Sequence, residues 1–246
     1  MSKRDGDRLG FPVFCTQFIN PDTGDVTEGF REKGFERDAF VNFIAMLGWN
    51  DGTERELFDM DALIESFSLE RVHKAGAKFN FEKATWFNQQ YLRNLPMKEL
   101  VSSCAEEIRK INASVSEDFL QHYVELYRDR IDFRYRLASI GNYMYSDIQE
   151  FDKETLKKKW TPEAKKFISD YIDFLNNTTL DSAEELEIET KKIIEQHHMS
   201  MGNILPVLRI LLTGTTKGPS LYETILLLGK EKSVERMGRA DYLLNS

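Results

Sequence analysis

Apolar side chains recur at helical spacing along most of the chain, starting near residue 37. The first clear stripe follows the i, i+3, i+4, i+7 spacing of one helix face and consists of Phe40, Phe43, Ile44 and Leu47. Later stripes begin after residues that favour the N-terminus of a helix, namely Asp59, Ser68, Asn80, Pro96, Ser116, Thr161 and Ser182. Gly214 and Gly229 are expected to end two later helices, and a last helix is predicted over residues 231–244.

The first 36 residues have a different pattern, rich in Gly, Pro, Asp and aromatic side chains. Phe11–Phe14 and Phe18-Ile19 are expected to be short extended segments, and Asn20–Asp25 carries strong turn residues. The Leu95-Pro96 junction is a natural boundary, because proline fits the first turn of a helix. We therefore expect a mainly α protein, with a small mixed α/β region over residues 1–92 and an all-helical domain over residues 93–246. Weaker periodicity near residues 141–160 marks where this domain could divide further.

Composition and charge exclude several classes of protein. The 246 residues include 41% hydrophobic and 12% aromatic side chains, which is typical of a globular chain rather than a disordered one. The longest apolar run, Ile225–Leu228, is far shorter than the ~20 residues of a membrane helix. The formal net charge of -8 argues against a non-specific nucleic-acid binder, although a local basic patch can still bind nucleic acid selectively.

Cysteine and histidine give no sign of a metal or redox site. The two cysteines, Cys15 and Cys104, lie far apart and outside any Cys-x-x-Cys motif, so a reducing compartment is expected. Cys104 shares the spacing of its apolar neighbours, which predicts that it is buried in a helix core. No set of His, Cys, Asp and Glu residues has metal-ligand spacing, so no metal site is predicted. No nucleophile or close carboxylate pair stands out, which argues against an independent enzyme.

Three blocks of sequence resemble one family in the same order. Residues 2–7, Ser-Lys-Arg-Asp-Gly-Asp, resemble the end of the signature loop of class I aminoacyl-tRNA synthetases, which in the glutamate-specific branch reads Lys-Leu-Ser-Lys-Arg-Asp-Gly-Asp. The second block runs from Glu36 to Leu92 and contains AFVNFIAMLGWN and FSLERV. The third block contains Leu208–Gly214, Gly218–Tyr222 and Leu228-Gly229. Together the blocks cover nearly the whole chain and are similar to the bacterial glutamyl-tRNA synthetases.

The resemblance implies a domain order and a partner. Residues 1–92 would correspond to the stem-contact region of that family and residues 93–246 to its helical anticodon-binding domain, whereas the related glutaminyl enzymes carry β-barrels there. The nucleotide-binding fold with its His-x-Gly-His motif is absent, so we expect a C-terminal part that is inactive alone. The whole enzyme would use ATP and Mg²⁺ to join glutamate to tRNA-Glu in the cytoplasm. We expect the chain itself to bind tRNA-Glu as a monomer, without a cofactor, DNA or a membrane.

The resemblance also implies functional residues. Lys3, in the signature loop, would contact the triphosphate of ATP in the full-length enzyme, whereas the residues alone describe a lysine in a charged tail. An anticodon-reading arginine of the family corresponds to Arg128 or Arg130. Both flank the apolar face of a predicted helix, where a planar guanidinium can meet base edges or phosphates. The alternative is a surface arginine paired with Asp129 or Glu125.

A second group of expected anticodon-binding residues lies further along the chain and consists of Arg209, Pro219, Leu221 and Tyr222. Arg209 interrupts an apolar helix, and such an arginine either extends its charge to solvent or meets an anion. Gly218-Pro219 would open a loop whose N–H groups can meet RNA, and Tyr222 can stack on an unpaired base. The alternative for Tyr222 is a place partly in the core. For the whole chain, the competing hypothesis is a helical scaffold that binds protein and no RNA, which the net charge of -8 favours.

Overall fold

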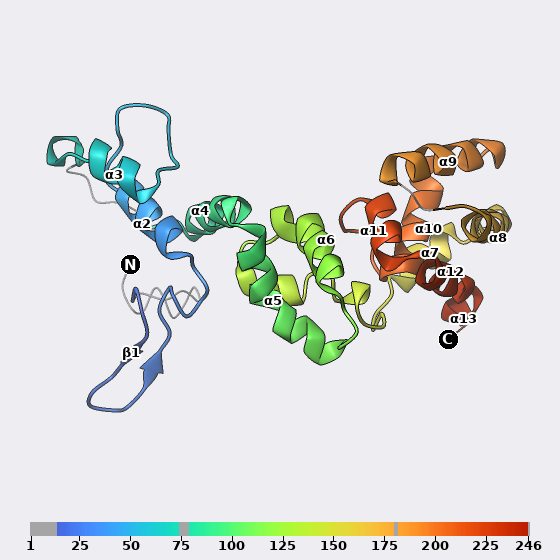
Figure 1. Ribbon diagram of the computed structural model, residues 1–246, viewed down its shortest axis with the longest axis horizontal. Coiled ribbons are helices and arrows are strands. Elements are labelled where there is room, and N and C mark those ends of the chain that lie inside the picture. Colours follow the sequence, from blue (N-terminus) through green and yellow to red (C-terminus); the bar gives the residue numbers. More distant parts are fainter. Residues whose placement is uncertain (1–13, 74–78, 180–181, 246) are drawn as a thin grey trace. The chain divides into compact units, whose positions relative to one another are not determined.

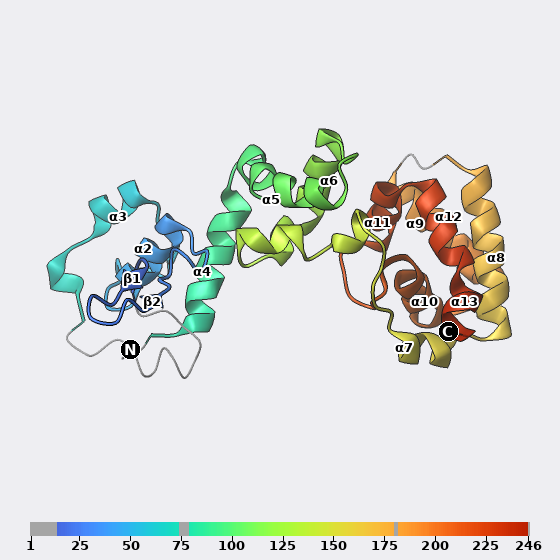
Figure 2. The same ribbon diagram turned by 90° about the horizontal axis from the view of Figure 1, so that it is seen from below.

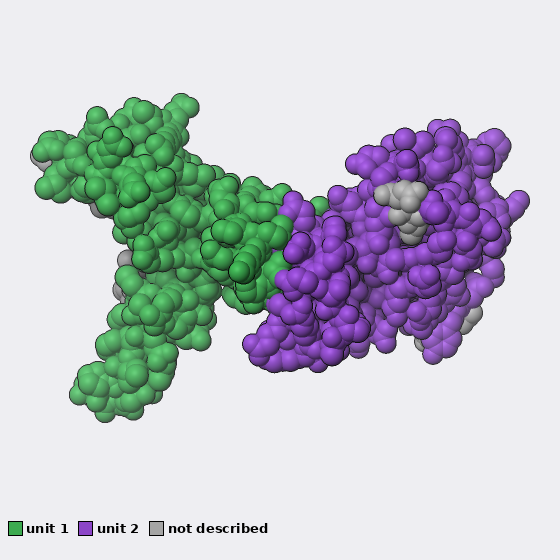
Figure 3. Space-filling view, in the orientation of Figure 1, with its two compact units in different colours: residues 1–104, 128–140 green, residues 105–127, 141–246 purple. Residues whose placement is uncertain are grey.

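Helices dominate the computed structural model, which describes residues 14–73, 79–179 and 182–245 (Figure 1). The expected mainly α fold is confirmed, with a two-stranded hairpin as the sheet of the described part. The residues form two compact units, coloured separately in Figure 3. Unit 1 contains the described residues up to Cys104 together with Arg128–Ile140, and unit 2 contains Ala105–Tyr127 and the described residues from Gly141 onward. The functional domains 1–92 and 93–246 stay a prediction.

Unit 1 begins with the hairpin and continues with helices joined by loops, the longer of which precede α2 and α3 (Figure 2). Its elements are β1 (Phe18–Ile19), β2 (Val26–Thr27), α2 (Arg37–Met46), α3 (Met60–Ser66), η1 (Leu69–Arg71), α4 (Phe81–Asn94), η2 (Arg128–Arg130) and η3 (Arg134–Ala138). Helix α5 (Met97–Ile111) belongs to unit 1 up to Cys104, which is fully buried as predicted. Unit 1 is therefore the mixed α/β part of the molecule.

The hairpin forms where the turn residues predict it. Its strands pair antiparallel, with Phe18 opposite Thr27. The turn is closed by a hydrogen bond of 2.8 Å from the Gly24 N–H to the Asn20 carbonyl. Gly24 has a φ of 74°, a conformation that glycine adopts without steric cost.

Helix α2 buries most of its predicted apolar stripe, since Phe43 is buried and Phe40 and Leu47 pack partly buried against the same cluster. Ile44 belongs to the stripe but is 45% exposed. The buried positions of the helix are Ala39, Asn42 and Phe43. Asn42 faces inward because its Oδ1 accepts hydrogen bonds of 2.9 Å from both the Phe58 N–H and the Tyr91 hydroxyl. The prediction for Ile44 was wrong because these partners come from segments distant in the sequence.

Aromatic side chains fill the interior of unit 1. The larger cluster consists of Phe30, Phe35, Phe43, Ala84, Phe87 and Phe133, and a smaller one consists of Trp49, Phe58 and Leu63. Asn88 joins three segments around the larger cluster. Its Oδ1 accepts from the Glu36 N–H at 2.7 Å, and its Nδ2 donates to the Asp132 carbonyl at 2.6 Å. Buried amide groups thus fix loops that have few backbone hydrogen bonds of their own.

Unit 2 is helical throughout its described residues (Figures 1 and 2). It takes the end of α5 and continues with α6 (Glu117–Tyr127), η4 (Asn142–Met144), α7 (Lys153–Lys159), α8 (Pro162–Asn177), α9 (Ala183–Gln196), α10 (Met201–Thr213), α11 (Leu221–Leu228), α12 (Lys230–Gly238) and α13 (Ala240–Asn245). The predicted last helix over residues 231–244 is in fact α12 followed by α13. The two separate at Arg239, whose N–H donates to the Arg236 carbonyl at 3.3 Å in a tight last turn.

Aliphatic side chains form one large core in unit 2. Fully buried members include Leu175, Ile204, Val207, Leu208, Ile210, Leu211, Leu212 and Ile225. The predicted helix starts of unit 2 are in place, whereas Ser68 of unit 1 makes no side-chain cap bond and precedes only the three-residue η1. Thr161 Oγ1 accepts from the Ala164 N–H at 3.2 Å, and Ser182 Oγ accepts from the Glu185 N–H at 3.1 Å. Each cap satisfies one of the N–H groups that a helix leaves unpaired at its start.

Helix α10 tolerates a proline in its interior. Pro206 has no N–H to donate to the carbonyl of Gly202 four residues earlier. The Lys159 ammonium group donates to that carbonyl instead, at 2.8 Å. A lysine of α7 thereby restores the hydrogen bond that the proline removes.

Candidate nucleic-acid interface

A short loop joins α10 to α11, and both of its ends are fixed by capping residues. Helix α10 ends at Gly214, whose φ is 81° and whose N–H donates to the Ile210 carbonyl at 2.8 Å. At the other end, Ser220 Oγ accepts from the Glu223 N–H at 3.4 Å and begins α11. Residues 215–220 between them form the loop, which contains the exposed side chains of Thr216 and Lys217.

Arg209 projects from α10 against this loop. Its side chain is half-buried, and its Nη1 donates to the Pro219 carbonyl at 2.8 Å. A Cβ at Gly218 would lie 3.0 Å from that nitrogen and 3.4 Å from the Tyr143 hydroxyl. The guanidinium therefore lies directly beside the Gly218 backbone, and the absence of a side chain there is what allows the close approach.

Leu221 and Tyr222 begin α11 and face the core of unit 2. Leu221 is 4% exposed and Tyr222 is 8% exposed, and Pro219 is also buried. Burial raises the pKa of the Tyr222 phenol, and the negative charge of Glu187 raises it further. A ring with so little exposed area has no open face for a base in the free protein. The alternative of a core position thus describes Tyr222 better than stacking does.

A pair of tyrosine hydroxyl groups lies behind Gly218. The Tyr127 hydroxyl donates to the Tyr143 hydroxyl at 2.6 Å, and both side chains are buried. Tyr127 is itself held closely, because a Cβ at Gly141 would lie 2.4 Å from its ring. The end of α6 and η4 thus form a tightly packed support for one side of the loop.

A buried arginine that the sequence analysis did not single out completes this region. Arg236 is 4% exposed, and its Nη1 donates to the Leu212 carbonyl at 2.6 Å. Its Nη2 donates to the carbonyls of Tyr143 at 2.6 Å and Ser146 at 3.0 Å. Burial lowers the pKa of the guanidinium, which still remains charged at neutral pH. The available signal was its position, since Ser233, Arg236, Met237 and Ala240 share the i, i+3, i+4, i+7 spacing of a buried face.

The other two predicted arginines belong to unit 1. Arg128 is half-buried, and its Nη2 donates to the carbonyls of Arg93 and, at 3.1 Å, Leu95, where α4 ends. Arg130 is exposed, and its guanidinium has no hydrogen bond or ion pair with the residues that the structure describes. Arg128 therefore uses part of its donor set on the protein, whereas the fork of Arg130 faces solvent. Lys3 lies outside the described residues.

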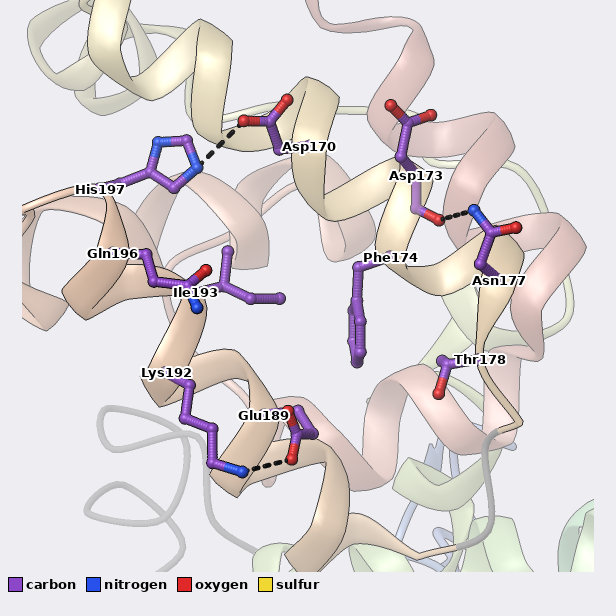
Figure 4. A pocket seen from close by; sticks show the side chains of 10 residues that line it. All are labelled: Asp170, Asp173, Phe174, Asn177, Thr178, Glu189, Lys192, Ile193, Gln196 and His197. Atoms are coloured by element: carbon purple, nitrogen blue, oxygen red, sulfur yellow. Dashed lines mark hydrogen bonds and ion pairs between the residues drawn. The ribbon is translucent and has the colours of Figure 1, made fainter.

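The hollow between α8 and α9 is a different kind of surface (Figure 4). It encloses about 600 Å³, and the figure shows Phe174 and Ile193 facing this space. Its lining carries three carboxylates and one lysine, Lys192, which already pairs with Glu189 at 2.7 Å, so it offers no excess of positive charge to a phosphate group. None of the predicted anticodon-binding residues lines it.

In residues 14–73, 79–179 and 182–245, no three His, Cys, Asp or Glu side chains gather as metal ligands do. No helix within the same ranges is both long and apolar enough to cross a membrane.

Comparison with known proteins identifies the family. A family model described as "Anticodon binding domain" matches residues 87–241, and one described as "tRNA synthetases class I (E and Q), catalytic domain" matches residues 23–86. Over 244 residues the chain is 36% identical to a glutamate–tRNA ligase of Porphyromonas gingivalis, in a match that covers 99% of this chain and 48% of the relative. The chain belongs to the glutamate–tRNA ligase family. The resemblance drawn from the three sequence blocks is thus confirmed.

Other members of the glutamate–tRNA ligase family agree in sequence and fold. The ligase of Phocaeicola vulgatus is 37% identical over 243 residues, covering 98% of this chain and 48% of the relative. A crystal structure of the Elizabethkingia meningosepticum ligase in complex with its amino acid is 33% identical and superposes with a TM-score of 0.90, covering 99% of this chain and 48% of that one. The Elizabethkingia anophelis enzyme is 32% identical, with a TM-score of 0.85 over 100% of this chain and 48% of its own. The chain thus spans about half the length of the relatives it matches. The family match does not favour the competing scaffold hypothesis.

Proposed function

We propose that this chain is the tRNA-binding portion of a glutamate–tRNA ligase and that it recognises the anticodon of tRNA-Glu. The observation that carries the proposal is the anticodon-binding-domain match over residues 87–241. That range contains every residue expected to bind the anticodon, namely Arg128, Arg130, Arg209, Pro219, Leu221 and Tyr222. Proteins that read RNA sequence mostly bind unpaired bases, which an anticodon loop provides.

The loop between α10 and α11 has the chemistry that such recognition needs. Arg209 donates from Nη1 to the Pro219 carbonyl, which holds its planar guanidinium beside the loop. Guanidinium groups in a fixed orientation can donate two hydrogen bonds to one base edge or to a phosphate. Lys217 adds a positive charge to the same loop. Pro219, Leu221 and Tyr222 are proposed to contribute by packing beneath this loop as buried support.

In unit 1, Arg130 is proposed to contact the anticodon arm through its exposed guanidinium. Arg128, which is half-buried at the end of α4, is proposed to contribute through its guanidinium.

The activity of the whole ligase is proposed from the family. It would use ATP and Mg²⁺ to join glutamate to tRNA-Glu in the cytoplasm, with Lys3 on the triphosphate. The present chain would bind tRNA as a monomer, with neither ATP nor Mg²⁺ bound to it.

The test is the affinity of the purified chain for two transcripts of tRNA-Glu, one with its anticodon intact and one with all three anticodon bases replaced. The proposal predicts that replacement weakens binding at least tenfold, the size of about one lost bidentate base contact. Binding should also weaken as salt rises, because basic side chains release counterions from the phosphates. Equal affinity for the two transcripts would overturn anticodon recognition, and no binding at any salt concentration would favour the scaffold alternative.

A further inference from the structure

Within the described residues, Arg236 is a buried cation whose side chain reaches both the end of α10 and η4. All three of its hydrogen bonds go to backbone carbonyls, those of Leu212, Tyr143 and Ser146. Burial of a charge is costly unless its donors are satisfied, and a lysine could not reach three acceptors in these directions from one nitrogen. An arginine at this position therefore does something that a hydrophobic side chain would not, which is to hold separate pieces of backbone in register.

The two pieces that Arg236 joins are the two supports of the proposed anticodon-binding loop. Leu212 lies in the last turn of α10, three residues after Arg209 and two before the cap at Gly214. Tyr143 lies in η4, and its hydroxyl is the group that a Cβ at Gly218 would approach to 3.4 Å. The guanidinium thus binds the backbone of α10, which carries Arg209, and the backbone of η4, which carries Tyr143, at the same time.

The charge of Arg236 also suits its place. The last carbonyls of a helix carry a partial negative charge, which a nearby cation stabilises. Helix α10 has no basic residue in its own last turn. Arg236 of α12 supplies one from outside, on the carbonyl of Leu212.

We propose that Arg236 is a positioning residue for anticodon recognition: it fixes α10 and η4 relative to each other, so that Arg209 and Gly218 meet the RNA in one defined arrangement. Arg236 itself touches no RNA, since it is 4% exposed. The inference rests on the proposed function of the loop.

The experiment compares Arg236→Met with Arg239→Met in the full 246-residue chain. Arg239 is the matched control, because it lies three residues further along, is 55% exposed in its side chain and is paired with Glu235. Both substitutions remove one positive charge, so the control shows what the loss of one charge alone does to binding. The measured quantity is the ratio of affinities for tRNA-Glu with its own anticodon and with a replaced one.

Arg236→Met is expected to lower this ratio by about tenfold, as expected when an arginine–base contact loses its geometry, and Arg239→Met to leave it within about twofold. A purely structural role would reduce the fraction of folded protein, which lowers binding to both transcripts and leaves their ratio unchanged.

A folded Arg236→Met protein with the wild-type ratio overturns the proposal. If Arg236→Met does not fold, Arg236→Lys decides, since it keeps the charge without the fork; a ratio below wild type supports the proposal, and the wild-type ratio overturns it. A wild-type protein with a ratio of one refutes the proposed function itself, which separates that failure from this one.

Discussion

The two units hold their interiors together in different ways. Unit 1 has aromatic clusters and two fully buried asparagines, Asn42 and Asn88. Each asparagine joins segments that are far apart in the sequence, and Asn88 alone connects α4 to residues 36 and 132. Unit 2 has a large core in which aliphatic side chains predominate, and its buried arginine, Arg236, bonds to both η4 and the end of α10.

Buried polar groups therefore have different roles in the two units. In unit 1 the amides replace the backbone hydrogen bonds that short helices and long loops lack, so they serve stability. Unit 2 is built mostly from helices, whose backbone groups bond within each helix. The carbonyl groups that Arg236 binds lie beside the proposed anticodon-binding loop, so we infer that Arg236 positions this loop. Substitutions in unit 1 should therefore change the free energy of unfolding, and substitutions near the loop should change RNA discrimination.

The largest effect is expected for Asn88→Ala in unit 1. The substitution leaves the Glu36 N–H and the Asp132 carbonyl without their partner inside the protein. Each unsatisfied group costs ~1–3 kcal/mol, so the free energy of unfolding should fall by about 3 kcal/mol. Urea denaturation measures it. The matched control is Asn94→Ala on the same helix, where the exposed amide bonds only to the Gln90 carbonyl and about 0.5 kcal/mol or less is expected. A loss below about 1 kcal/mol for Asn88→Ala would contradict the stabilising role of the amide.

A smaller effect, on recognition rather than stability, is expected for Gly218→Ala. The new Cβ would lie 3.0 Å from Arg209 Nη1, so the guanidinium must shift by a few tenths of an ångström from its place on the Pro219 carbonyl. The affinity ratio between intact and replaced anticodons should fall by about tenfold, the size of one arginine–base contact.

Gly202→Ala is the control for that substitution, because a Cβ there meets no atom within 4 Å and the residue lies in the same helix, α10. It should leave the affinity ratio unchanged and raise the free energy of unfolding by about 0.5 kcal/mol, since alanine favours helix. Equal ratios for the two glycine variants would show that the position of Arg209 does not matter for discrimination.

The smallest effect is expected for Thr190→Val in the core of unit 2. Thr190 Oγ1 lies 2.8 Å from the Tyr171 hydroxyl, and both side chains are fully buried. Removing the threonine hydroxyl leaves the tyrosine hydroxyl without this partner, so a loss of about 1 kcal/mol is expected in urea denaturation. Adding Tyr171→Phe should cost less than the sum of the two single losses, because both partners are then apolar. Additive losses would mean that the two hydroxyl groups do not stabilise each other.

The sequence predicted local features well because neighbouring residues determine them. The caps at Asp59, Asn80 and Ser182 bond to N–H groups three residues away, and all three are present. The three blocks of family resemblance predicted the fold class correctly. What depends on distant partners was missed, as with the inward face of α2 around Asn42 and the carbonyl acceptors of Arg236.

The candidate site was predicted in part. The spacing of Arg209 and Pro219 gave no reason to expect their hydrogen bond, since a loop of unknown path separates them. The same holds for Tyr222, whose amphipathic ring is consistent with stacking on RNA and with burial alike. The structure shows that the Tyr222 side chain is 8% exposed and so packs in the core of the free protein.

The most direct test of the account is anticodon discrimination by Arg209→Met, with Arg239→Met as the matched exposed arginine. Affinities are measured for tRNA-Glu transcripts with the anticodon intact and with each anticodon base replaced singly. The account predicts that Arg209→Met weakens binding to the intact tRNA and lowers discrimination by about tenfold or more at one anticodon position, while Arg239→Met weakens all transcripts alike. A folded Arg209→Met protein that discriminates between the transcripts as well as the wild type does would contradict the account.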